Sequence, residues 1–161
     1  MRDRPLVGIV MGSVSDRDVM DEWAKTLKEM EISFEITVSS AHRSPDKTRD
    51  YAINAPDRGI EVIIAGAGWA AHLAGVLASY TRLPVIGVPI DSSPLSGMDS
   101  LLSTVQMPPG VPVATMAIGR GGARNAAVFA AQILALKYDD VAKRLETYKE
   151  GLMRVKGVGK D

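Results

Sequence analysis

The sequence predicts an α/β fold: a three-layer α/β/α sandwich on a five-stranded, parallel, flavodoxin-like sheet, with an extra C-terminal helix. Short apolar runs alternate along the chain with segments in which apolar residues recur at helical spacing. Parallel strands buried on both faces read as continuous apolar runs, and right-handed crossovers place helices on both faces of their sheet. With 161 residues and 46% hydrophobic content, the chain is long enough to bury such a core.

The first three elements follow from simple patterns. Residues 6–11 form an uninterrupted apolar run, which predicts a buried strand. Residues 16–30 carry apolar side chains on one helical face, and Ser15 with Asp18 resembles a capping box at the start of that helix. Residues 34–38 alternate between apolar and polar side chains, which predicts a second strand.

The middle of the chain continues the alternation of strands and helices. A proline suited to the first helical turn opens a short helix at 45–55. Apolar runs at 62–65, 85–88 and 113–118 predict three further strands. A helix is expected at about 70–80, between the first two of these strands.

The last part of the chain predicts two more helices. An alanine-rich helix is expected at about 123–136. An amphipathic helix of mixed charge is expected at about 139–153, where it forms either a solvated face or a partner helix at an oligomer interface. Segments 94–100 and 105–112 predict a structured loop and a turn, and residues 154–161 a frayed tail.

The composition excludes several classes of function. Lysines and arginines number 19, as do aspartates and glutamates, so no broad basic surface for nucleic acid or an anionic membrane is expected. The absence of cysteine excludes disulfides, a thiolate nucleophile and a cysteine-based zinc site. Without a recognisable signal peptide or membrane span, residues 1–161 are expected to form one cytoplasmic domain with its core at 6–136. A net charge of zero also favours a homo-oligomer.

Polar or glycine-rich segments follow all five expected strands. The carboxyl ends of parallel strands meet at one edge of the sheet, and ligands bind there in open α/β folds. A binding site is therefore expected at this edge. The five segments are 13–16, 40–43, 66–72, 91–94 and 119–122.

The first of these segments suits a phosphorylated sugar. Ser13 and Ser15 lie between a strand and a helix N-terminus, where hydroxyls and free N–H groups suit a phosphate, and Asp16 suits a sugar hydroxyl. Helix capping is the alternative, although a second serine and an acid exceed what a cap requires. The segment lacks the Gly-Lys-Ser/Thr of a P-loop, which argues against hydrolysis of nucleoside triphosphates.

The two histidines of the chain are the candidates for proton transfer. His42 and Arg43 together offer a proton shuttle and an anion clamp, unless His42 only satisfies loop backbone groups. His72 is either a buried orienting residue or a catalytic one. Two histidines without cysteine or paired carboxylates argue against a metal site.

A dinucleotide site is an alternative for the third segment. Gly66, Gly68 and Ala71 match the fingerprint G-x-G-x-x-[GA] between a strand and a helix. That fingerprint usually opens a fold, however, and here it follows the third strand, with few residues left for a second nucleotide half. We therefore favour the other interpretation, in which the glycines let a different ligand approach the backbone.

Motifs in these segments resemble the class I N5-carboxyaminoimidazole ribonucleotide mutases of purine biosynthesis. The resemblance runs from about residue 7 to 136, with the motifs in order and nearly without gaps. The related carboxylase class typically has lysine where Arg43 stands. The matching motifs are Met11-Gly-Ser-x-Ser-Asp16, Ser40-Ala-His-Arg43, Ala65-Gly-Ala-Gly68, Ala70-Ala-His-Leu73, Leu83-Pro-Val-Ile-Gly-Val-Pro89, Asp99-Ser-Leu-Leu-Ser103 and Val105-Gln-Met-Pro108.

The resemblance implies a cofactor-free, octameric enzyme with active sites between subunits. It would move a carboxylate from the exocyclic nitrogen of an aminoimidazole ribonucleotide to ring carbon C4, by decarboxylation, retention of CO2 and recarboxylation. His42 would be the general acid and base, Ser13 and Arg43 would bind phosphate, and Asp16 the ribose. The further substrate-binding residues that it implies are Ser15, Ser40, Ala41, Gly68, Ala70, His72 and Leu73.

Three positions depart from the family pattern. The family usually has glycine at Trp69 and proline at Ala74, in the loop that would hold CO2, and tryptophan at Arg17. If the family glycine requires a positive φ, Trp69 is expected to be strained, and loss of proline at 74 to loosen the loop. Two alternatives follow: a direct carboxylase of the same fold that uses CO2, and a catalytically silent ribonucleotide-binding paralogue.

Overall fold

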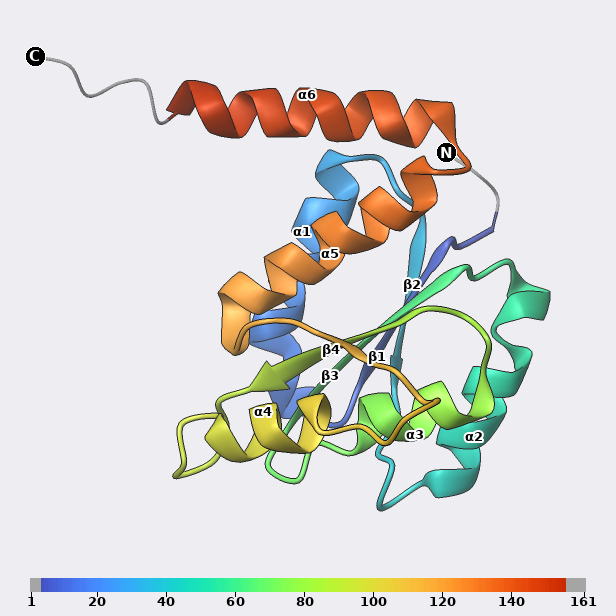
Figure 1. The fold of residues 1–161 in the computed structure, drawn as a ribbon, viewed down its shortest axis with the longest axis vertical. Coiled ribbons are helices and arrows are strands. Elements are labelled where there is room, and N and C mark those ends of the chain that lie inside the picture. Colours follow the sequence, from blue (N-terminus) through green and yellow to red (C-terminus); the bar gives the residue numbers. More distant parts are fainter. Residues whose placement is uncertain (1–3, 156–161) are drawn as a thin grey trace, which may run out of the picture.

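A five-stranded, all-parallel sheet forms the centre of the protein in a computed structural model that describes residues 4–155 (Figure 1). The strand order is β2-β1-β3-β4-β5, the flavodoxin-like order, which confirms the predicted fold class. The strands are β1 Val7–Met11, β2 Phe34–Val38, β3 Val62–Gly68, β4 Val85–Ile90 and β5 Ala114–Thr115.

Helices cover both faces of this sheet. α1 and α5 pack together on one face, and α2, α3 and α4 lie on the other, while α6 packs across α5 at one end of the molecule (Figure 1). The helices are α1 Arg17–Glu29, α2 Pro45–Asn54, α3 Leu73–Tyr80, α4 Met98–Val105, α5 Gly119–Ala135 and α6 Asp139–Val155, with short 3-10 helices η1 Val14–Asp16 and η2 Pro56–Arg58. No helix within residues 4–155 is long and apolar enough to cross a membrane.

The strands alternate their side chains between two apolar cores. In β1, Val7 and Ile9 face the core under α1 and α5, whereas Val10 faces the core under α2 and α3. Alanines form the inner face of α5, which lets this helix approach the sheet closely. The fully buried alanines of α5 are Ala123, Ala126, Ala127, Ala130 and Ala131.

Close packing accounts for Gly66, the first glycine of the dinucleotide fingerprint. A Cβ at Gly66 would lie 2.2 Å from Cη2 of Trp23, whose side chain is fully buried. Gly66 is therefore required by the core, whatever ligand binds nearby.

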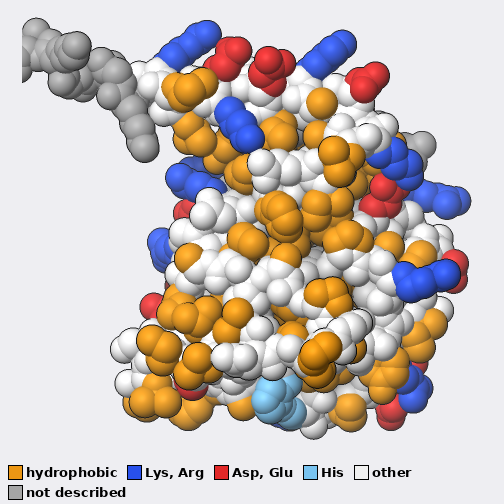
Figure 2. Space-filling model, in the orientation of Figure 1, with side chains coloured by type: hydrophobic (Ala, Val, Ile, Leu, Met, Phe, Trp, Pro, Cys, Tyr) orange, Lys and Arg blue, Asp and Glu red, His pale blue; other side chains and the backbone are white. Residues whose placement is uncertain are grey.

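The prediction of a loop was wrong for residues 98–100, which begin α4. This helix buries hydroxyl residues and exposes its apolar ones: Ser100 and Thr104 are buried, while Met98 and Leu102 are about half exposed. The Ser100 hydroxyl lies 2.9 Å from the Ile90 carbonyl oxygen, so hydrogen bonds replace the apolar stripe that sequence patterns detect. In Figure 2, apolar side chains gather over α4 and its neighbouring loops.

Other element boundaries differ by a few residues. β5 spans two residues instead of the six predicted, α3 begins three residues later than expected, and α5 begins four residues earlier. α6 continues to Val155, so the first two residues of the predicted tail are helical, and the remainder, 156–161, lies outside the described residues.

Candidate functional site

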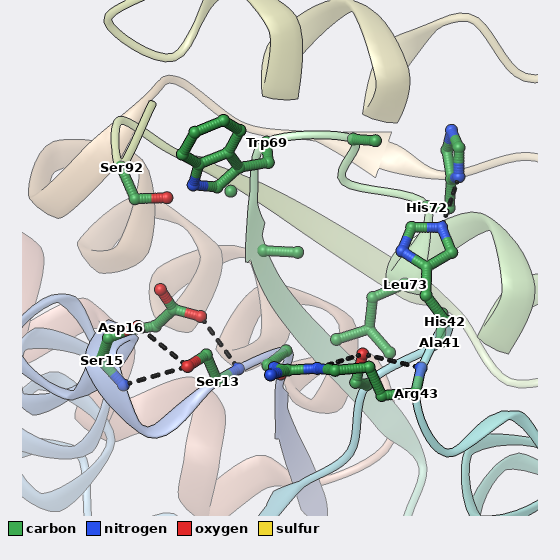
Figure 3. Close-up of a pocket in the computed structure, with 15 residues that line it drawn as sticks. Ser13, Ser15, Asp16, Ala41, His42, Arg43, Trp69, His72, Leu73 and Ser92 are labelled. Atoms are coloured by element: carbon green, nitrogen blue, oxygen red, sulfur yellow. Dashed lines mark hydrogen bonds between the residues drawn. The ribbon is translucent and has the colours of Figure 1, made fainter. Parts of the chain in front are cut away.

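The loops that follow β1, β2, β3 and β4 surround a cavity of about 530 Å³ at the carboxyl edge of the sheet (Figure 3). Every residue predicted for the site lines this cavity. The predicted residues along its wall are Ser13, Ser15, Asp16, Ser40, Ala41, His42, Arg43, Gly68, Ala70, His72 and Leu73.

The cavity also has lining residues that were not assigned to the site. Gly12 and Ala67 contribute from the ends of their strands, and Ser92 contributes from the loop after β4. Ser92 belongs to a segment already expected at this edge, so its position in the chain was the available signal. The segment at 119–122, which was also expected at this edge, does not line the cavity and forms the first turn of α5.

The first wall is a serine-rich turn ahead of α1. The capping box joins Ser13 to Asp16, so the predicted pairing of Ser15 with Asp18 was wrong. The Ser13 N–H donates to Asp16 Oδ2 over 3.1 Å, and the Ser15 N–H lies 3.3 Å from Ser13 Oγ, which accepts it. The two serine hydroxyls are 2.9 Å apart. This arrangement gathers hydroxyls and the positive end of a helix at the cavity, which suits an anion.

Asp16 is a buried carboxyl group at the edge of this wall. Asp16 is 5% exposed. Burial raises the pKa of Asp16, and the hydrogen bond from the Ser13 N–H partly opposes this rise. A raised pKa in the folded state means that the stability from this group is present at low pH and is lost as pH rises through that pKa.

Asp16→Asn is therefore expected to stabilise the protein at neutral pH. Asparagine does not ionise, and its amide oxygen can accept the Ser13 N–H. Urea unfolding from mildly acidic to neutral pH should show a smaller loss of stability with rising pH in the variant than in the wild type. The control is Asp18→Asn, at an exposed position in the first turn of α1. Parallel pH profiles for the wild type and Asp16→Asn would contradict this role of the buried carboxylate.

Arg43, in the loop after β2, connects that loop with the serine-rich turn after β1. Its backbone N–H and its Nε donate to Ser40 Oγ over 3.2 and 3.5 Å, and its Nη2 lies 3.4 Å from the Gly12 carbonyl oxygen. Among residues 4–155, no carboxylate lies within ion-pair distance of this exposed guanidinium. Its positive charge is thus available to an anion beside the serines.

His42, from the loop after β2, and His72, from the loop after β3, meet at the cavity. His42 Nε2 lies 2.8 Å from His72 Nδ1, and the rings meet edge to face at 82°. One proton is shared between these nitrogens, since one must accept what the other donates. Among the described residues no hydrogen bond engages His42 Nδ1, and Figure 3 shows this nitrogen on the cavity side of the ring. The pair can therefore hold one imidazole oriented while its other nitrogen exchanges a proton with a ligand.

The loop after β3 completes the cavity. A Cβ at Gly68 would lie 1.8 Å from Ser92 Oγ, so glycine is needed for this close approach. Trp69 has a φ of 55°, the left-handed conformation in which a bulky side chain is strained. Ala74 is buried in the first turn of α3. Within residues 4–155, no group of three or more potential metal ligands is present.

Comparisons with known proteins identify the family of the chain. The family model described as AIR carboxylase matches residues 6–154. A protein of Pyrococcus abyssi named N5-carboxyaminoimidazole ribonucleotide mutase is 57% identical over 150 residues, which cover 93% of this chain and 85% of that one. The Thermotoga maritima protein of the same name is 58% identical, covering 93% of this chain and 86% of its own.

The fold of the chain is also similar to that of a solved structure. A crystal structure of Treponema denticola PurE superimposes with a TM-score of 0.83 and 30% identity, over 94% of this chain and 93% of that one. Residues 6–154, which the family model matches, include all five strands and every residue that lines the cavity. The chain belongs to the AIR carboxylase family.

Proposed function

We propose that this protein is an N5-carboxyaminoimidazole ribonucleotide mutase of purine biosynthesis. It converts its substrate to 4-carboxy-5-aminoimidazole ribonucleotide by moving the carboxylate from the exocyclic nitrogen to C4. The observation that carries the proposal is the hydrogen-bonded pair of His42 and His72, in a cavity that is also lined by serines and by the guanidinium of Arg43. Relatives of that name at 57% and 58% identity support it.

The ribonucleotide is bound by its phosphate and its sugar. Ser13, Ser15 and Arg43 hold the phosphate through hydroxyls, N–H groups of the first helical turn and one charge-assisted contact. Asp16, anchored by the Ser13 N–H, accepts a hydrogen bond from a ribose hydroxyl. The nucleobase then extends toward the histidines. Ser40 orients the Arg43 side chain, because its hydroxyl oxygen accepts a hydrogen bond from Arg43 Nε.

His42 moves one proton in each direction during the reaction. As the N–C bond breaks, its electron pair returns to nitrogen, which takes a proton from His42, and CO2 is released into the cavity. C4 then attacks CO2, and the proton on C4 passes back to His42 as the ring regains aromaticity. Atoms and charge balance with no co-reactant. Because Nε2 is engaged by His72, Nδ1 is the nitrogen that exchanges this proton.

The loop after β3 retains the CO2 between the two steps. The apolar side chains that line this part of the cavity are those of Ala41, Ala70 and Leu73. Gly68 has no side chain and therefore lets the ligand approach the backbone N–H groups. CO2 has no net charge and binds weakly to isolated groups, so confinement next to C4 supplies most of its effective concentration.

Competition between substrates separates this proposal from the alternatives. At low bicarbonate, the N-carboxylated ribonucleotide should be consumed and the decarboxylated ribonucleotide should remain unchanged. Preference for the decarboxylated ribonucleotide with bicarbonate would show a direct carboxylase. A protein that binds the ribonucleotide tightly without turnover, and that gains turnover on Trp69→Gly, would be a silent paralogue.

Arg43→Ala is expected to weaken substrate binding. A charge-assisted hydrogen bond contributes roughly 1.5–3 kcal/mol, so KM should rise about 10- to 100-fold while kcat changes much less. Steady-state kinetics measures this split. Arg49→Ala is the matched control, since Arg49 is an exposed arginine of α2 that pairs with Asp46 and Asp50 and does not line the cavity. An unchanged KM in Arg43→Ala would remove the phosphate clamp from the proposal.

We also propose that the protein works in the cytoplasm as a homo-octamer of single-domain subunits, as the family resemblance implies. The exposed apolar residues Met98, Leu102 and Val105 recur along α4 at helical spacing and support association between subunits. Light scattering tests this directly, with an expected mass of eight times the 17.2 kDa chain.

A further inference from the structure

Trp69 has two features that packing of the fold does not explain. Trp69 is 60% exposed, whereas Trp23, the other tryptophan, is fully buried in the core. Its φ of 55° is unfavourable for a bulky L-residue, because Cβ crowds the following carbonyl. Strained backbone at a residue that adds little to the core is found most often at functional sites.

The indole forms part of the cavity wall. Apart from the imidazoles of His42 and His72, Trp69 is the only aromatic residue among the described residues that line the cavity. Figure 3 shows the indole beside Ser92, across the cavity from the two histidines. A ligand held by the serines and reaching His42 would pass between these two sides.

We infer that Trp69 is a positioning residue, whose indole packs against the ribonucleotide on the side of the cavity opposite His42. This inference rests on the proposed function for the identity of the ligand. An aminoimidazole ribonucleotide presents a flat heteroaromatic ring and a sugar, and an indole offers each a large, rigid apolar surface. The contact contributes binding energy for the ribonucleotide beside His42, and the strained backbone is what holds the indole there.

The inference predicts opposite effects on binding and on folding. Trp69→Gly removes the indole and relieves the left-handed backbone, so KM should rise about tenfold or more while kcat stays within about threefold. Its urea midpoint should not fall below that of the wild type. Trp69→Phe keeps an aromatic surface and should retain KM within about threefold.

Glu31→Gly is the matched control for relief of backbone strain. Glu31 has a φ of 51° in the turn after α1 and does not line the cavity. Its replacement should reproduce the folding behaviour of Trp69→Gly without any change in KM. A Trp69→Gly variant that binds substrate as tightly as the wild type would overturn the inference.

Fluorescence tests the contact without turnover. With two tryptophans, one of them buried, a ligand-dependent change in emission reports on Trp69. Titration with the decarboxylated ribonucleotide, 5-aminoimidazole ribonucleotide, should change the emission of the wild type and leave that of Trp69→Phe unchanged. If the fluorescence of the wild type does not change when the ligand binds, for example because another copy of the chain covers the indole, the inference is overturned.

The two measurements separate this inference from the proposed reaction. A ligand-dependent Trp69 signal in a protein that fails to convert the N-carboxylated substrate supports the inference and overturns the proposed function. Normal conversion that is insensitive to Trp69→Gly overturns the inference and leaves the proposed function intact.

Discussion

His42→Asn is expected to lower kcat about 100- to 10,000-fold, which is the contribution of a positioned general acid and base. Asparagine retains a polar side chain in the same loop but cannot deliver and recover a proton within the reaction. Affinity for 5-aminoimidazole ribonucleotide should change little, because the proposed phosphate and ribose contacts come from Ser13, Asp16 and Arg43. Steady-state kinetics, with the fluorescence titration for binding, measures both quantities.

His72→Asn provides the comparison within the pair. The substitution removes the 2.8 Å partner of His42 Nε2 and leaves His42 itself in place. Its effect on kcat should therefore be smaller than that of His42→Asn, about 10- to 100-fold, as for other residues that orient a functional imidazole. Full activity in His42→Asn would show that His42 does not transfer the proton. A larger loss of kcat in His72→Asn than in His42→Asn would make His72 the general acid and base.

Gly122→Ala is expected to destabilise the fold severely, by roughly 3–5 kcal/mol or enough to prevent folding. A Cβ at Gly122 would lie 1.6 Å from the carbonyl oxygen of Ala117, which belongs to the chain entering α5. Because the obstacle is a backbone atom, no side-chain rotation can relieve the overlap. The free energy of unfolding in urea, or the yield of folded protein, measures the effect.

The neighbouring glycine supplies a matched control. A Cβ at Gly121 has no heavy atom within 4 Å, and Gly121 is exposed in the first turn of α5. Gly121→Ala should therefore be neutral or stabilising by up to about 1 kcal/mol, since alanine favours the helix. Equal stability of the two alanine variants would contradict the close approach of Gly122 to Ala117.

The sheet and its binding edge were predictable because the apolar runs of buried parallel strands are distinctive. The segments 6–11, 34–38 and 85–88 became β1, β2 and β4 within two residues at either end. Once the strands were identified, the edge followed from topology, since every polar segment came directly after a strand. The four loops that line the cavity lie where this reasoning expected them.

What the sequence could not predict depends on contacts between distant residues. α4 escaped detection because its buried face is made of Ser100 and Thr104, whose hydroxyls bond to backbone oxygens. The hydrogen bond between His42 and His72 joins residues 30 positions apart, so no local pattern could reveal it. Trp69 was recognisable as a departure from the family, but the position of its indole depends on a left-handed backbone that the sequence does not reveal.

The fate of the transferred carboxylate tests the central claim most directly. The N-carboxylated ribonucleotide would be prepared with an isotopic label in its carboxylate and supplied to the enzyme in a large excess of unlabelled bicarbonate. A mutase that retains CO2 in its cavity predicts a product that carries the label at the C4 carboxylate. An unlabelled product, formed from bicarbonate in solution, would contradict intramolecular transfer.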